Sequence, residues 1–230
     1  MSKPAWGRVF AGLREAAAVP WSSYVEHAFV HGLATGRLPQ ASFRRYLMQD
    51  YVFLIHFARA WSLAVVKSGS PDEMRLAAAT VHALLDEEMD LHVRTCAGWG
   101  IDEAALRATP EASANLAYTR YVLDAGVSGD LLDLLVALAP CVFGYGEIGA
   151  RLQAAPVPDN PYQEWIDTYG GDDYQQACER VGRLLDMVAD RRLGPQPQAS
   201  PRWPALVGTF ETACRLEADF WAIGLATGGP

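Results

Sequence analysis

The sequence holds few cysteines, and none lies close to another. Four occur in 230 residues, with no C-x-x-C pair, at Cys96, Cys141, Cys178 and Cys214. Disulfide frameworks and structural zinc sites place their cysteines at short, recurring spacings, which this chain lacks. We therefore expect four reduced thiols, each of which has to be judged singly.

The sequence also lacks a signal peptide and a long uninterrupted apolar run. Its first residues, MSKPAWGRVFAGLREAA, place a glycine and charges where a signal peptide has its apolar core. Even the apolar stretch VFLIHFARAWSLAVV contains His56 and Arg59, so we expect no membrane span. These absences predict a soluble, cytoplasmic protein with no membrane partner.

Positive charge is scarce. The chain has 19 Lys and Arg against 27 Asp and Glu, a net charge of -8, and its basic residues are scattered. This distribution argues against nucleic acid as a partner. Half of the residues are hydrophobic, so the chain can bury a sizeable core, and we expect one domain over residues 1–230.

Strand-like alternation is nearly absent, whereas helix start and stop signals recur. Pro20 and Pro39 precede long amphipathic stretches. Ser70 and Pro71, with Glu73 three residues after the serine, predict a capped helix start. The signals predict an all-α multi-helix bundle of roughly eight to nine helices, several longer than about 20 residues.

Three segments have a predictable place in this bundle. The helix from about residue 130 to 155 is leucine-rich on almost every side and should be central. The stretch 71–97 has charges on one side and apolar residues, Leu85 among them, on the other. The Pro-rich segment 193–204 should be a loop that leads into the last helix.

GYGEIG, residues 144–149, matches the G-x-G-x-x-G pattern of dinucleotide-binding sites. That pattern works at a turn between a strand and a helix, and here it lies inside a helical pattern. We reject the nucleotide hypothesis and expect the glycines to let another helix or a ligand approach closely.

Cys141 allows two interpretations. Most unpaired cysteines are small buried hydrophobes. However, Tyr145 lies four residues on, on the same helix face, and Pro140 disturbs the helix beside the thiol. Ionising an ordinary thiol at neutral pH costs about 2 kcal/mol, which a neighbouring group can supply, so a nucleophile stays open.

Two carboxylates lie on apolar helix faces. Glu217 precedes Phe220 and Trp221 by three and four residues, and packing among rings would raise its pKa into the range of a general acid. Asp50 shares a stripe with Phe53. It either pairs with a neighbouring helix or binds a cationic or amidine-like ligand.

Glu88 and His92 are spaced i, i+4, which can place two ligands on one metal ion. A solvated acidic face or a Glu–His hydrogen bond is the commoner outcome. A metal site would need further ligands from other helices.

Five separated motifs together resemble the TenA family, also called thiaminase II or aminopyrimidine aminohydrolase, over about residues 20–225. They are YLMQDYVFL, DEEMDLH, LAPCVFGYGEIG, NPYQEWIDTYGG and LEADFW. The resemblance implies the heme-oxygenase-like all-α fold and the branch of the family that depends on a cysteine. It also implies a homotetramer and a reaction without metal or organic cofactor.

The resemblance also assigns roles to residues. Cys141 matches the nucleophile and Glu217 the acid/base residue, while Asp50 matches the aspartate that holds the aminopyrimidine. Four aromatic residues match substrate-binding positions: Phe53, Tyr118, Tyr145 and Tyr169. The implied reaction converts aminomethylpyrimidine or thiamin to hydroxymethylpyrimidine. Two alternatives stay open, namely a metal-dependent oxidase of the same fold and a non-enzymatic pyrimidine-binding or regulatory protein.

Overall fold

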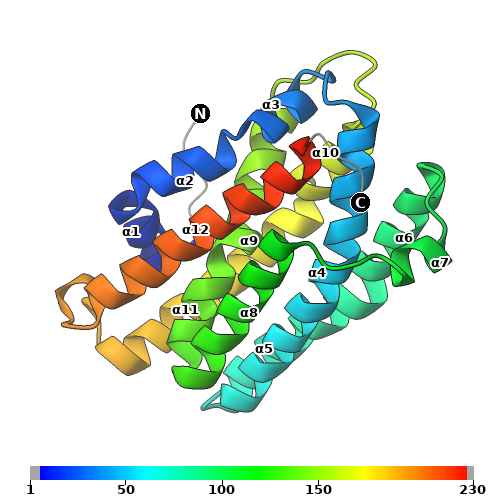
Figure 1. The fold of residues 1–230 in the computed structure, drawn as a ribbon. Helices are drawn as coiled ribbons and strands as arrows, with labels where there is room; N and C mark the ends of the chain where they lie inside the picture. The colour runs from blue at the N-terminus through cyan, green and yellow to red at the C-terminus, as the bar shows by residue number, and fades with distance from the viewer. Residues whose placement is uncertain (1–5, 227–230) are drawn as a thin grey trace.

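The protein is a bundle of helices packed around one central helix (Figure 1). The computed structural model describes residues 6–226 and contains no strand in that range. Its α-helices are α1 (Arg8–Ala16), α2 (Ala18–Val25), α3 (Ala28–Ala34), α4 (Gln40–Lys67), α5 (Pro71–His82), α6 (Met89–Gly98), α7 (Glu103–Arg107), α8 (Ser113–Ser128), α9 (Leu131–Gln153), α10 (Gln163–Gly170), α11 (Asp172–Leu193) and α12 (Trp203–Leu225). A π-helical segment, η1 (Ala83–Glu88), joins α5 to α6, and a 3-10 turn, η2 (Pro197–Ala199), precedes α12. The all-α prediction is confirmed.

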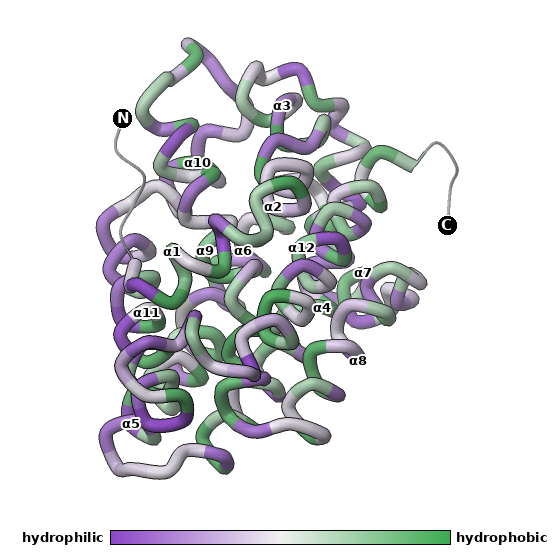
Figure 2. The backbone as a smooth tube through the Cα atoms, turned by 90° about the vertical axis from the view of Figure 1, so that its left-hand side faces the viewer, coloured by the Kyte–Doolittle hydropathy of each residue, from purple (hydrophilic) through white to green (hydrophobic). Residues whose placement is uncertain are grey.

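Helix α9 is the central element, as the sequence predicts for residues 130–155. Asp130 caps it, because its carboxylate accepts hydrogen bonds from the backbone of Leu132 and Asp133. Helices α2, α4, α8, α10, α11 and α12 all pack against it. Outer helices such as α5 and α11 instead alternate hydrophilic and hydrophobic positions (Figure 2). The site described below is therefore built around α9.

The expectation that no apolar run is long enough to span a membrane is wrong for α9. Leu131–Gln153 passes that test by length and composition. However, 89% of its most apolar window is buried inside the fold. Side chains of the surrounding helices thus cover the surface that a lipid bilayer would otherwise cover.

The predicted number of helices is too low, because several helices are short. Twelve α-helices occur in residues 6–226. Pro20 does not precede a helix but lies at the third position of α2. A proline is tolerated there because the first N–H groups of a helix have no partner within it. By contrast, Pro39 stands directly before α4, and the four longest helices have 22 to 28 residues.

The stretch 71–97 is not one amphipathic helix. Ser70 caps α5 through the backbone N–H of Glu73, as predicted, but the Glu73 carboxylate accepts from Gly69 rather than from Ser70. The π-helical segment η1 then changes the register, so that Leu85, predicted on the apolar side, is 49% exposed. Short π-helical segments are frequent at functional sites.

The glycines of residues 144–149 admit close neighbours, as predicted. A Cβ on Gly144 would lie 2.1 Å from the ring of Tyr24. A Cβ on Gly149 would lie 2.3 Å from the backbone of Tyr169, at the α9–α10 contact. The motif lies inside α9 and not at a strand-to-helix turn, which agrees with the rejection of the nucleotide hypothesis.

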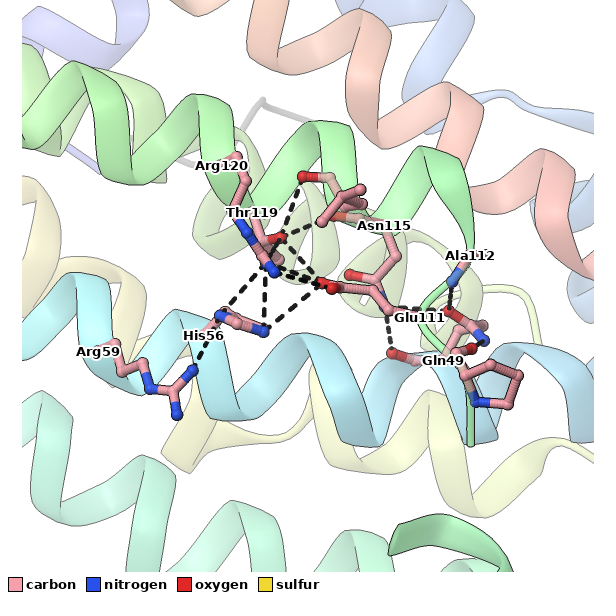
Figure 3. A network of polar contacts seen from close by, with 10 residues as sticks. Gln49, His56, Arg59, Glu111, Ala112, Asn115, Thr119 and Arg120 are labelled. Carbon is pink, nitrogen blue, oxygen red and sulfur yellow. Dashed lines mark hydrogen bonds and ion pairs between the residues drawn. The ribbon is translucent and has the colours of Figure 1, made fainter. Parts of the chain in front are cut away.

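A polar network fixes α8 on α4 (Figure 3). The side chain of Gln49 donates to the carbonyl of Pro110 and accepts from the N–H of Ala112, both at 2.9 Å. Asn115 donates to the carbonyl of Gln49 at 2.8 Å. Farther along, Glu111 pairs with Arg120 of α8 at 2.9 Å, and its Oε1 lies 3.5 Å from Nε2 of His56 on α4. The contacts of Gln49 and His56 thus link the two helices that carry Asp50, Phe53 and Tyr118.

Candidate active site

The seven predicted site residues come from five helices and are all buried. Helix α4 carries Asp50 and Phe53, α8 carries Tyr118, α9 carries Cys141 and Tyr145, α10 carries Tyr169, and α12 carries Glu217. None of the seven is more than 8% exposed. Their mutual contacts, described below, place them in one region of the bundle.

Cys141, Glu217 and Tyr118 form one group of interacting side chains. The phenol of Tyr118 donates to Oε1 of Glu217 at 2.8 Å. The Cys141 thiol interacts with the same carboxyl. Burial raises the pKa of Glu217 to about 8, although the Tyr118 hydrogen bond and the interaction with Cys141 act to lower it. The expectation of a raised pKa among aromatic neighbours is confirmed, and Glu217 holds its proton near neutral pH.

The Cys141 thiol is harder to ionise than the sequence indicates. Burial raises its pKa well above the usual value, and the carboxyls of Glu217, Glu88 and Asp50 raise it further. Ionisation therefore costs more than the 2 kcal/mol expected for an ordinary thiol. A reactive thiolate at this position needs a base that takes the proton, and Glu217, whose carboxyl interacts with the thiol, is the candidate.

Asp50 is buried without a cationic partner among the described residues. Its Oδ2 accepts from the phenol of Tyr46 at 3.2 Å and lies 3.5 Å from Nδ1 of His92. Burial lowers the pKa of His92 to about 4, so the imidazole is neutral at pH 7. Its Nε2 lies 2.8 Å from the carbonyl of Leu47, which places the ring proton on Nε2.

The hypothesis that Asp50 forms an ion pair is therefore wrong at neutral pH. Burial raises the pKa of Asp50 to about 7, against the effect of the Tyr46 hydrogen bond. Both contacts of this carboxyl fall on Oδ2. Such a group can donate or accept a hydrogen bond, which suits an amidine-like ligand.

Aromatic rings form the walls of the site. Phe53 stacks on Tyr118, with ring centroids 5.3 Å apart, and on Phe57, also at 5.3 Å. Tyr145 packs edge-on against Tyr169 at 4.9 Å and tilted against Trp221 at 5.2 Å. Flat apolar walls of this kind suit a planar aromatic ligand.

Several polar residues at this site were missed by sequence reasoning. Tyr46 lies four residues before Asp50, a spacing that could have signalled their hydrogen bond, and Trp165 donates to its phenol at 3.1 Å. Tyr24 is fully buried, and its hydroxyl has no partner in the described structure. Tyr24 lies on α2, far from Cys141 and Glu217 in the sequence, so no local pattern could have signalled its place at the site.

An open cleft of about 1000 Å³ lies beside the buried group. Parts of α5, η1, α10 and α11 line it, together with Phe57 of α4 and Val142 of α9. A smaller hollow of about 30 Å³ adjoins Tyr46, His92 and Trp165. Glu88 and Tyr169 line both hollows. Of the seven predicted site residues, only Tyr169 lines the cleft.

Glu88 and His92 do not act as a pair. Glu88 interacts with Tyr169, whereas His92 contacts Leu47 and Asp50. Among the side chains that the structure describes, which do not include that of Glu87, no three His, Cys, Asp or Glu gather where they could hold a metal ion. The metal-dependent alternative therefore has no ligand cluster among these described side chains.

The four cysteines are free and buried, so each stays separate from the others in the fold.

Glu147, six residues after Cys141, accepts from Arg14 at 2.7 Å and from the indole of Trp21 at 3.3 Å. It ties α1 and α2 to α9, and it takes no part in the group of Cys141, Glu217 and Tyr118.

Comparison with known proteins agrees with the sequence motifs. The model of the TENA/THI-4/PQQC family matches residues 15–226. A Haemophilus influenzae protein described as uncharacterized is 41% identical, over 89% of this chain and 93% of its own. A Halalkalibacterium halodurans protein named aminopyrimidine aminohydrolase is 36% identical, over 92% of each chain.

Solved structures extend the similarity to the fold. A Silicibacter protein described as a TenA family transcription regulator is 57% identical, covers 99% of this chain and 100% of its own, and superimposes with a TM-score of 0.96. A Shewanella denitrificans domain of unknown function with a heme oxygenase-like fold is 16% identical, over 94% of this chain and 91% of its own, with a TM-score of 0.69. The predicted heme-oxygenase-like bundle is thereby confirmed.

Proposed function

The chain belongs to the TENA/THI-4/PQQC family, and we propose that it is an aminopyrimidine aminohydrolase of thiamin salvage. The group of Cys141, Glu217 and Tyr118 is the main support, because it joins a thiol to a carboxyl that holds a proton near neutral pH. The bacterial relative with this enzyme name adds support. The proposed substrates are aminomethylpyrimidine and thiamin, and their common product is hydroxymethylpyrimidine.

In this proposal Asp50 binds the pyrimidine. One oxygen of its carboxyl pairs with a ring nitrogen, and the other accepts from the adjacent amino group. The recorded protein contacts of Asp50 both fall on Oδ2, so Oδ1 has no competing partner among the described residues. The rings of Phe53, Tyr145 and Tyr169 cover the faces of the planar substrate.

Catalysis then uses Glu217 and Cys141 together. Glu217 protonates the pyrimidine ring, which makes the ring electrophilic, and then accepts the thiol proton as Cys141 adds to the ring carbon beside the substituted methyl group. The electron pair returns through the ring and breaks the bond from the methyl carbon to the leaving nitrogen, which departs as neutral ammonia from a protonated amine, or as a neutral thiazole from thiamin. Water adds to the resulting exocyclic methylene, and expulsion of Cys141 restores the aromatic ring. The sum is one hydrolysis without net oxidation, so the reaction requires no redox partner.

A second candidate is a pyrimidine-binding regulator that does not turn its ligand over. The 57% identical Silicibacter protein carries a regulator's description, and the same buried pocket could serve binding alone. The two candidates differ in whether the Cys141 thiol completes a catalytic cycle.

The proposal also includes a homotetramer, which the family resemblance implies, and a location in the cytoplasm, which the sequence predicts. Light scattering on the purified protein tests the assembly. A mass near four times that of one chain supports it, and a mass equal to one chain contradicts it.

A turnover assay separates the candidates. Purified protein is incubated with aminomethylpyrimidine or with thiamin, and hydroxymethylpyrimidine and ammonia are quantified. We expect one ammonia and one hydroxymethylpyrimidine for each aminomethylpyrimidine consumed. Tight pyrimidine binding without product would favour the regulator, and the absence of both binding and turnover would contradict both candidates.

A further inference from the structure

Glu88 is a carboxyl at the edge of the site that the proposed chemistry leaves without a role. It ends the π-helical segment η1 and is partly exposed. It lines the open cleft on one side and the small hollow beside His92 and Trp165 on the other. The carboxyl therefore stands where the buried part of the site meets solvent.

The surroundings connect Glu88 to the reacting groups. Tyr169, one of the proposed walls of the pyrimidine pocket, lines the same two hollows as Glu88 and interacts with its carboxyl. The charge of Glu88 acts on Cys141, and the charge of Asp50 acts on Glu88. Glu88 therefore interacts electrostatically with both groups proposed to hold the substrate, Asp50 at the pyrimidine and Cys141 at the reacting carbon.

The position of the cleft indicates how a bound substrate is oriented in the site. Asp50, at 3% exposure, and Glu217, at 1%, form the closed part of the site. The cleft begins at Val142, next to Cys141, and at Phe57, whose ring stacks on Phe53. A pyrimidine held at Asp50 therefore has its leaving group on the side of the cleft, where products can depart.

We propose that Glu88 forms the subsite for a cationic amine leaving group. This subsite rests on the proposed hydrolase function and deepens it. The Glu88 carboxylate pairs with the ammonium group of the substrate, and substituents on the amine extend into the cleft. A thiazolium has no N–H to donate to Glu88, so the subsite favours aminomethylpyrimidines over thiamin.

Two further observations agree with this assignment. Burial raises the pKa of Glu88 to about 8, with a further contribution from Asp50, so a carboxylate at this place is costly until a cation joins it. The rim of the cleft carries Asp167, Asp172 and Asp173 against Arg180. An acidic rim raises the local concentration of cationic ligands.

The test compares two ligands that differ only in the group that Glu88 would contact. Binding of aminomethylpyrimidine and of hydroxymethylpyrimidine is measured at pH 7 in Cys141→Ala protein, which prevents turnover. Adding Glu88→Gln should weaken aminomethylpyrimidine binding by roughly 10- to 100-fold. Binding of hydroxymethylpyrimidine should change by less than about twofold, which also shows that the variant is folded.

The matched control is Asp86→Asn, in the same π-helical segment. The Asp86 carboxylate is 63% exposed and pairs with His82, so this variant should bind both ligands like its parent. An equal effect of Glu88→Gln on the two ligands, or no effect, would overturn the subsite. Failure of the Cys141→Ala protein to bind either ligand would instead overturn the proposed function, and the subsite with it.

Discussion

The phenol of Tyr118 donates a 2.8 Å hydrogen bond to Oε1 of Glu217, across 99 positions of the sequence. The bond joins α8 to α12, two helices that pack against each other and against the thiol-bearing helix α9. It fixes the orientation of a carboxyl that also interacts with the Cys141 thiol. Catalysis by Glu217 should therefore depend on a tyrosine that need not touch the reacting atoms.

Replacing Tyr118 by Phe tests this dependence. The hydrogen bond lowers the pKa of Glu217, so its loss should raise that pKa. The basic limb of the kcat profile, where Glu217 loses its proton, should then move to higher pH. We expect kcat to fall about tenfold, as for the loss of one hydrogen bond to a charged group. A lower kcat with an unmoved profile would show that Tyr118 acts on something other than Glu217.

Three carboxyls with raised pKa values predict how stability depends on pH. Folding raises the pKa of Asp50 to about 7, and that of Glu88 and Glu217 to about 8. Between the ordinary pKa of a carboxyl and the raised pKa of the folded state, the folded protein binds more protons than the unfolded chain. The free energy of unfolding therefore falls as pH rises through this range. Burial lowers the pKa of His92 to about 4, which has the opposite effect, but only below the ordinary histidine value of 6.5.

Between pH 6.5 and 8 the opposing effect of His92 is absent. In this range the thermal unfolding midpoint without ligand should shift to lower temperature as pH rises. Glu217→Gln mimics the protonated carboxyl and should flatten the slope. The exposed pair of Arg75 and Asp72 offers a control, since Asp72→Asn should leave the slope unchanged. A midpoint that is constant or rises across this window would contradict the raised pKa values of the three carboxyls.

Gly149 should not tolerate a side chain. A Cβ there would lie 2.3 Å from Tyr169 and 2.5 Å from Gly170, in both cases from backbone atoms. Gly149→Ala must displace α10, and we expect a loss of about 1–3 kcal/mol in the free energy of unfolding, together with a loss of activity through Tyr169.

Gly208→Ala, in helix α12, is the matched control. No atom lies within 4 Å of a Cβ there, so alanine should be neutral or stabilise the protein by up to about 1 kcal/mol. Denaturant titrations of the two variants measure the contrast. Equal stability of both would contradict the tight α9–α10 contact.

Sequence reasoning reached the long helices because their signals are local. Leucine on every side of residues 131–138 indicates a buried helix, and Asp50 and Glu217 stand out as acids on apolar faces. The separated motifs then brought these acids and Cys141 together through the family resemblance. The contacts of Tyr118 with Glu217, and of Tyr46 with Trp165, depend on how the helices pack, so no local pattern predicts them.

The π-helical segment shows why the rest was missed. Six residues with i to i+5 hydrogen bonds leave no periodic pattern that differs from an α-helix. The i, i+4 spacing of Glu88 and His92 therefore wrongly indicated a pair, whereas η1 turns Glu88 toward Tyr169. Likewise, spacing alone could not reveal that burial raises the pKa of Cys141.

Ammonia release from aminomethylpyrimidine by the Cys141→Ala protein tests the central claim most directly. Cys178→Ala serves as the control. Cys178 is also buried, and its thiol donates to the carbonyl of Val142 at 3.5 Å. We predict that Cys141→Ala lowers the rate by a factor on the order of a thousand or more, while Cys178→Ala retains most of the activity. An unchanged rate in folded Cys141→Ala protein would contradict the account.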